Sequence, residues 1–290
     1  MLRPASGVYA FYDGRIPGRR FAREPNWVDE GALSLGVASY AIVSGNAALV
    51  YDTHVSVDHG RRIRSVLEGE GVSTFTVVLS HWHLDHVAGT EAFDDCEIIA
   101  NERTAELLAG AREAIENGTL NGPPAIDPLV LPTRTFGGER RLELGGLRLE
   151  LLHTDIHSDD ATLIWWPERG LLFCGDALED TVTYVDEAAS LPVHRANLDR
   201  LRRLEPSRIL PNHGAPETIA AGGYSDGLIE ATEDYIDFLL RSREDPSLAR
   251  VTLRELVASA GNADVHYYQP YERVHERNVR AVGDSTDGRA

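Results

Sequence analysis

A chain of 290 residues can bury a substantial core without disulfides or a structural metal, either as one large domain or as two small ones. The net charge of -18 gives a surface that repels phosphate backbones, which disfavours a nucleic-acid partner. All 28 basic residues are arginine, which excludes Schiff-base chemistry on a lysine.

The two cysteines and the N-terminus indicate where the protein works. Cys96 and Cys174 lie far apart and form no CxxC pair, so neither a disulfide framework nor a thiolate metal site is expected. The N-terminus runs into mixed polar sequence, and no apolar stretch approaches the length of a membrane span. The sequence therefore predicts a cytoplasmic protein with no membrane partner.

The first elements of the chain predict strands followed by a helix and a further strand. Strands are expected over residues 7–12 and 37–51, the second folded as a hairpin. The segment 13–36 between them is expected to be a surface loop that could shape a pocket mouth. Apolar residues at helical spacing predict a helix over 57–68, and 74–79 is typical of a buried strand.

A cluster of metal-binding side chains follows this strand directly. The stretch Ser80–His86 contains four of them, His81, His83, Asp85 and His86. At the end of a strand, His81 and His83 can face one metal while Asp85 and His86 face a second. Histidines that only serve a core or a turn are the alternative, but so many clustered imidazoles would repel one another without a cation. Asp52 could support this site or cap a turn, and both roles stay open.

The middle of the chain predicts a strand, a helix and a loop. Residues 97–100 form the expected strand, and Asn101 is a plausible N-cap for a helix that ends near Glu116. The turn-rich segment 117–124 is either a lid or pocket wall, or an inert surface excursion.

Further strands again end at metal-binding residue types. The expected strand segments are a hairpin within 140–151, then 161–166, 171–175 and 207–210. The residues that follow these segments are His153, His157, Asp176 and His213. The order strand, strand, helix recurs in both halves, which predicts two sheets.

The C-terminal part is expected to be helical. Helices are predicted over 194–204, 228–240 and 251–260, and residues 284–290 are expected to be disordered. The side chains of His266 to Tyr268 and of His275 could reach the site, but a structural role in a partly buried position is preferred.

The motifs together resemble those of the metallo-β-lactamase superfamily. The resemblance covers about residues 37–215 and consists of His81-x-His83-x-Asp85-His86, His157, Gly175-Asp176 and Pro211-Asn212-His213-Gly214. It implies an α/β fold, a four-layer αββα sandwich of two mixed β-sheets flanked by helices. That domain would span residues 1–222, and residues 223–290 would form a helical extension packed on it.

The resemblance also implies a complete binuclear site. His81, His83 and His157 would hold one zinc, Asp85, His86 and His213 the other, and Asp176 would bridge them. Two Zn²⁺ per chain are expected, with iron or manganese as alternatives. His157 is preferred to His153 because the following polar turn and strand are similar to those of lactamase-type relatives.

Two departures from the family weaken any narrower assignment. The Pro-Gly-rich turn that many hydroxyacylglutathione hydrolases and lactonases show near the third histidine is absent. Glu179 stands where some lactonases have a tyrosine, and Tyr184 is a distant substitute.

The function implied is that of a zinc-dependent hydrolase acting on a small molecule with a carbonyl electrophile. A metal-bridging hydroxide would cleave an ester, thioester, lactone or lactam, while Asp85 stabilises the leaving group or relays a proton. The alternatives are an iron-dependent oxidoreductase of the same fold, a metal-stabilised binding module and a phosphodiesterase or nuclease. The acidic surface favours neutral or cationic substrates.

Overall fold

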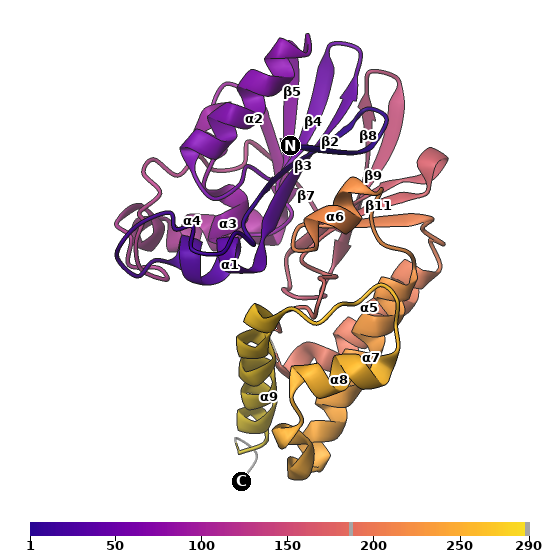
Figure 1. The fold of residues 1–290 in the computed structure, drawn as a ribbon. Helices are drawn as coiled ribbons and strands as arrows, with labels where there is room; N and C mark the ends of the chain where they lie inside the picture. Colours follow the sequence, from indigo (N-terminus) through magenta and orange to yellow (C-terminus); the bar gives the residue numbers. More distant parts are fainter. Residues whose placement is uncertain (186–187, 288–290) are drawn as a thin grey trace.

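Two β-sheets lie face to face in the computed structural model, which describes residues 1–185 and 188–287 (Figure 1). The seven strands of the first sheet are, in spatial order, β1 (Leu2–Ala5), β2 (Val8–Asp13), β3 (Val37–Ser44), β4 (Ala47–Tyr51), β5 (Thr74–Val78), β6 (Glu97–Asn101) and β7 (Arg134–Phe136). The five strands of the second are β12 (Arg208–Pro211), β11 (Leu171–Gly175), β10 (Ala161–Trp166), β9 (Leu147–Thr154) and β8 (Glu139–Leu144). Both sheets are mixed, because β4 to β7 are parallel neighbours in the first and β11 and β12 in the second.

The inner faces of the sheets are joined by aromatic packing and by two buried hydroxyl groups. Phe173 packs edge-on against Tyr40 and Tyr51, with ring centroids 5.4 and 6.4 Å apart. A buried tyrosine hydroxyl needs a partner. The hydroxyl of Tyr51 donates to the carbonyl of Thr162 at 2.5 Å, and that of Tyr40 to the carbonyl of Pro211 at 2.5 Å. These contacts hold the strand ends of the two sheets in a fixed relation.

Helices cover the outer face of the first sheet. They are α2 (Val57–Gly69) and α4 (Glu102–Glu116), with the short α3 (Leu84–Val87) and the 3-10 turn η2 (Thr90–Phe93) nearby. Ile63 of α2 and Leu108 of α4 are buried in one apolar cluster with Val77 of β5. The side chain of Asn101 accepts from the amide of Arg103 at 2.8 Å, as expected for the N-cap of α4.

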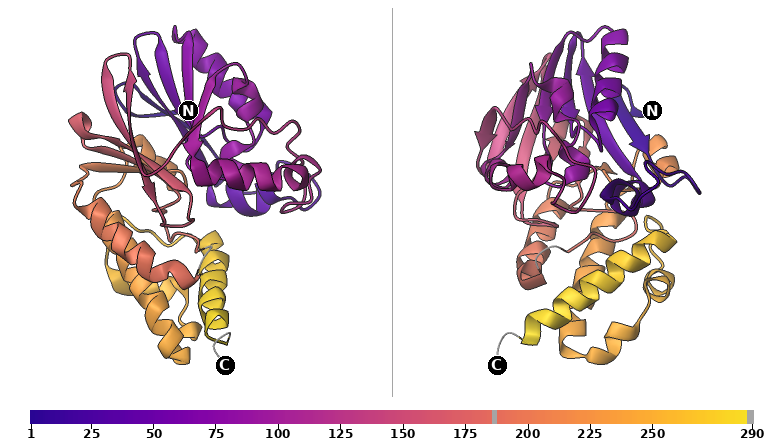
Figure 2. Two further views of the ribbon diagram at one scale, coloured as in Figure 1. Left: turned by 180° about the vertical axis from the view of Figure 1, so that it is seen from behind. Right: turned by 90° about the vertical axis from the view of Figure 1, so that its left-hand side faces the viewer.

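Four helices gather at one end of the sandwich (Figure 2). They are α5 (Leu191–Arg202), α7 (Gly227–Glu244), α8 (Leu253–Ala260) and α9 (Glu272–Asp287), with the 3-10 turns η4 (Ala188–Ser190), η5 (Pro246–Arg250) and η6 (Gln269–Tyr271). The short α6 (Pro216–Ala220) contacts β1 instead, and the 3-10 turn η3 (Pro167–Arg169) connects β10 and β11. The predicted αββα sandwich of two mixed sheets is confirmed. The boundary at residue 222 stays a prediction. None of the described helices is both long and apolar enough to cross a membrane.

Several sequence-based boundaries were wrong. Segment 13–36 is not a loop throughout, because it contains the π-helical turn η1 (Val28–Ala32) and the short α1 (Leu33–Leu35). The edge strands β1 and β7 were missed, since each is too short for a periodic pattern to emerge. Residues 284–287 belong to α9, whose Val282 is fully buried, and 288–290 lie outside the described residues.

Candidate metal centre

The residues predicted to bind metal come together at one end of the sandwich, each just beyond the end of a strand. His81, His83, Asp85 and His86 follow β5, and His157 follows β9. Asp176 follows β11, and His213 follows β12. Two groups form here: His81, His83, His157 and Asp176 in one, and Asp85, His86 and His213 in the other.

Three ring nitrogens converge in the first group. His81 Nε2 lies 2.9 Å from His83 Nδ1 and 3.2 Å from His157 Nε2, and the last two atoms are 3.1 Å apart. Ligands about 2.0–2.1 Å from a tetrahedral zinc would be about 3.3 Å from one another. The triangle is therefore close to the size that one metal ion requires.

Asp176 connects this triangle with the second group. Its Oδ2 atom lies 3.1 Å from His86 Nε2, 3.3 Å from His213 Nε2 and 3.6 Å from His81 Nε2. His213 Nε2 also lies 3.2 Å from Asp85 Oδ2. One carboxylate oxygen is thus central to ligand atoms from both groups.

Outer hydrogen bonds fix which nitrogen of several rings points inward. His157 Nδ1 lies 3.0 Å from the carbonyl oxygen of Tyr184, and His213 Nδ1 lies 2.7 Å from that of Gly36. A carbonyl can only accept, so Nδ1 carries the proton and Nε2 presents a lone pair to the centre.

Asp52 supports the candidate site, which is one of the two roles left open by the sequence. Its Oδ2 atom lies 3.0 Å from His86 Nδ1, and its Oδ1 atom accepts from the amide of Ser80 at 2.6 Å. The side-chain amide of Asn212 also donates to Asp52 Oδ2. Asp52 therefore both orients His86 and fixes the backbone at the start of the histidine motif.

Burial and charge favour different protonation states in the two groups of the metal-free chain. Burial and the nearby His86 and His83 lower the pKa of His81 well below its usual value, which leaves it a neutral ligand. Burial also lowers the pKa of His213, but the carboxylates, Asp176 first, outweigh it and raise that pKa well above its usual value.

A cation fits this arrangement. Asp176 Oδ1 is buried and has no hydrogen-bond partner among the described residues, which is costly for a carboxylate. A bound metal would give Asp176 Oδ1 and the inward nitrogen lone pairs of the histidines a partner. The donor set of imidazoles and carboxylates is the one that zinc and iron prefer in proteins.

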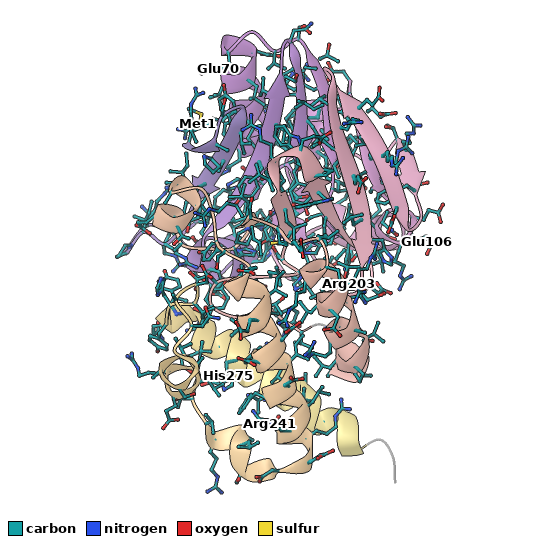
Figure 3. All side chains as sticks on the ribbon, turned by 90° about the vertical axis from the view of Figure 1, so that its right-hand side faces the viewer. Met1, Glu70, Glu106, Arg203, Arg241 and His275 are labelled. Carbon is teal, nitrogen blue, oxygen red and sulfur yellow. The ribbon has the colours of Figure 1, made fainter. Side chains whose placement is uncertain are left out.

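The alternative ligand His153 lies outside both groups. It belongs to β9, and its Nε2 atom lies 2.9 Å from the carbonyl oxygen of Asp159. The geometry therefore favours His157 over His153 at this position. His266 and His275 do not belong to either group, and His275 contacts Tyr235 among the C-terminal helices (Figure 3).

A cavity of about 720 Å³ opens over the centre. Its floor includes His83, Asp85, His157, Asp176 and His213. Its walls come from three distant parts of the chain: the segment 27–35, the loop at Leu120 and Asn121, and the region of η6 and α9. Of the two interpretations of segment 117–124, the structure supports the pocket wall.

Glu179 is a buried residue beside the centre that the sequence indicated only as a departure from family pattern. Its carboxylate accepts from the hydroxyl of Tyr271 at 2.9 Å and from the amide of Tyr184 at 3.1 Å, and it lies 4.0 Å from His157 Nδ1. Burial and the charge of Asp176 raise the pKa of Glu179 to about 7. Arg273 and Arg277 of α9 also line the cavity, and no local sequence signal predicted their position.

A comparison with known families decides the identity of this architecture. The family described as the metallo-beta-lactamase superfamily matches residues 34–213. The chain belongs to this superfamily. The matched range includes every strand that carries a candidate ligand, while α7, α8 and α9 lie beyond it.

Sequence relatives within the superfamily are distant. The beta-lactamase-like protein 2 homologs of Drosophila melanogaster and Caenorhabditis elegans are 26% and 22% identical, over 62% and 72% of this chain. The chain spans 59% and 64% of the length of these two relatives. A hydroxyacylglutathione hydrolase of Chromohalobacter salexigens is 30% identical over 44% of this chain and 43% of its own length.

Solved structures of superfamily members share the fold. A metallo-beta-lactamase family protein from Thermus thermophilus aligns over 99% of this chain and 95% of its own, with a TM-score of 0.62 and 19% identity. The DIM-1 metallo-beta-lactamase aligns over 81% of this chain and 94% of its own, with a TM-score of 0.59 and 19% identity. At these identities the likeness concerns the fold alone.

Proposed function

We propose that this superfamily member is a zinc-dependent hydrolase that cleaves an ester, thioester, lactone or lactam bond of a small molecule. The observation that carries the proposal is Asp176 Oδ2, which lies 3.1 to 3.8 Å from ring nitrogens of both ligand groups at the floor of a 720 Å³ cavity. Cavities of about 300–1,000 Å³ are typical of small-molecule sites.

The proposed ligand sets follow the two groups. His81, His83 and His157 would hold one metal, and Asp85, His86 and His213 the second. Asp176 would bridge them. When bound, such a metal pair lowers the pKa of a shared water toward about 7 and polarises a carbonyl oxygen.

Asp85 is the residue of the chain proposed to move a proton. It lines the cavity, its side chain is 18% exposed, and its Oδ2 atom lies 3.2 Å from His213 Nε2. Its carboxylate can therefore hold a proton taken from the attacking water and deliver it to the leaving group. The neighbouring Trp82 and Leu84 line the cavity beside Asp85.

The relatives support the class of bond. One relative carries the name hydroxyacylglutathione hydrolase, and another, from Passalora fulva, the name atrochrysone carboxyl ACP thioesterase. Both names describe hydrolysis at an acyl group. We extend this chemistry to the present chain, with a small-molecule substrate in a cytoplasmic protein.

A screen of matched substrates tests the proposal. The zinc-loaded protein should hydrolyse at least one of 4-nitrophenyl acetate, an acyl thioester, a lactone and a β-lactam, should lose the activity on chelation and should regain it with zinc. Bis(4-nitrophenyl) phosphate serves as the phosphodiester control. Activity on the phosphodiester alone, or none on any carbonyl substrate with both metals bound, would contradict the proposal.

A further inference from the structure

Two arginines of α9 stand at the mouth of the cavity over the candidate metal centre. Arg273 and Arg277 are four residues apart on one helix, so their side chains lie on the same face. Both line the 720 Å³ cavity together with candidate ligands such as Asp85 and His213. Two positive charges therefore lie on the surface that a substrate in this cavity would contact.

Neither arginine forms an ion pair with a carboxylate among the described residues, and both side chains are exposed. Arg277 instead lies over the ring of Tyr184, 4.5 Å from its centroid. By contrast, Arg19 and Arg20 nearby are engaged by Asp13 and Asp29. The guanidinium groups at the mouth are therefore available to a ligand.

The exposed charges of the cavity differ in net sign from the whole molecule. The chain carries 46 acidic and 28 basic residues, yet the exposed charged side chains that line the cavity are Arg273, Arg277 and Glu30. The other carboxylates of the cavity have partners inside the protein. Asp85 and Asp176 belong to the candidate ligand groups, and the buried Glu179 accepts a hydrogen bond from Tyr271. Arginine is the side chain that binds carboxylates and phosphates with paired hydrogen bonds.

The cavity continues beyond Arg273. A second cavity of about 420 Å³ shares Glu30, Ser34, Pro270 and Arg273 with the first. Its other charged lining residues are Arg15, Arg19 and Arg20 with the carboxylates Asp13 and Asp29. The first cavity has apolar surface as well, from Trp27, Trp82 and Val274. The lining thus suits a molecule with an apolar body next to the centre and a negatively charged end at α9.

We propose, on the basis of the hydrolase function proposed above, that the substrate carries a carboxylate or phosphate at its non-reacting end, and that Arg273 and Arg277 bind this group. The acidic composition had favoured neutral or cationic substrates. The position of α9, which brings Arg273 and Arg277 to the cavity, reverses that expectation for the site itself.

Matched esters separate this inference from the proposed function. The probes are 4-nitrophenyl monoesters of succinic, adipic and suberic acid, compared with the neutral butyrate, hexanoate and octanoate esters of equal chain length. The zinc-loaded wild type should prefer at least one anionic ester. Arg273→Ala and Arg277→Ala should lower kcat/KM for that ester by roughly 10- to 100-fold, mainly through KM, since each removes a hydrogen bond to a charged group.

The neutral esters and a matched variant are the controls. Rates on the neutral esters should change little in either variant, which also reports that the fold is intact. Arg280→Ala removes an exposed arginine of α9 that lines neither cavity, and it should leave the preference unchanged. Phenyl phosphate and benzoate, tested as competitive inhibitors of the anionic ester, show whether phosphate or carboxylate is preferred.

The outcomes are distinct. Hydrolysis of neutral esters without any preference for the anionic ones, or equal losses on both in the arginine variants, would overturn the role of Arg273 and Arg277 and leave the hydrolase intact. Failure on all esters would instead contradict the proposed function. A single-stranded RNA oligonucleotide that is cleaved and outcompetes the esters would assign the arginines to a nucleic-acid backbone and overturn the proposal.

Discussion

At the scale of single residues, the candidate centre is defined by what lies behind each histidine. The carbonyls of Tyr184 and Gly36 accept from His157 and His213, so those rings are held with Nε2 inward before any metal arrives. The motif His81 to His86 was recognisable in the sequence because its members are neighbours in the chain. Their outer partners were not, since Tyr184 and Gly36 reach the site only after folding.

The contrast between His157 and His153 is a prediction at this scale. His157→Ala should remove a ligand of the first metal and abolish most activity, because its Nε2 atom completes the triangle with His81 and His83. His153→Ala should leave metal content unchanged, since that ring contacts the carbonyl of Asp159. Elemental analysis and kcat of both variants decide the assignment. Metal loss in His153→Ala alone would reverse it.

Asp176 gives a second prediction. Asp176→Ala should abolish hydrolysis and lower metal content while circular dichroism stays close to that of the wild type, because the core does not depend on the site. Asp58→Ala, in which the lost side chain is 92% exposed, is the matched control. Full activity of Asp176→Ala would show that this carboxylate has no role in metal binding or hydrolysis.

At the scale of elements, the strands and helices with a clear apolar period were predictable and the short edge elements were not. The hairpin of β3 and β4, the helix α2 and the strand β5 follow from period and turn residues. The strand β7 has three residues and is defined by pairing with β6, which no local pattern reports. The helix α9 was missed, although its Val282 and the preceding Tyr271 of η6 are buried in the core.

The helix α5 carries a pH-sensitive group away from the centre. His194 is fully buried, burial lowers its pKa to about 4, and neither ring nitrogen has a hydrogen-bond partner among the described residues. The unfolded chain, with a histidine pKa of about 6.5, binds more protons between these values, so the free energy of unfolding falls as the pH drops through this window.

The test compares His194→Leu with the wild type in urea at pH 7.5 and pH 5. Between pH 7.5 and pH 5 the free energy of unfolding should fall in both proteins. The fall should be larger in the wild type than in the variant, by on the order of 2 kcal/mol. Metal ligands that titrate over the same range contribute equally to both proteins and cancel. Parallel pH dependence of the two proteins would show that His194 is not kept neutral by the fold.

At the scale of the whole molecule, the site is an assembly of distant parts of the chain. The sandwich provides the floor, whereas Trp27, Leu120 and α9 provide the walls. The side chain of Trp27 donates to the carbonyl of Pro124 at 3.0 Å, which joins two of these walls. Metal chemistry could be predicted from a seven-residue motif, but substrate selection depends on these long-range contacts and could not.

The number of metals bound per chain tests the central claim most directly. The protein, freed of metal by chelation and dialysed against excess zinc, should bind close to two zinc ions per chain, because ligand atoms form two groups joined by Asp176. Hydrolytic activity should rise with added zinc and reach its maximum near two equivalents. A chain that holds one iron and no second metal under metal-replete conditions would contradict the binuclear hydrolase.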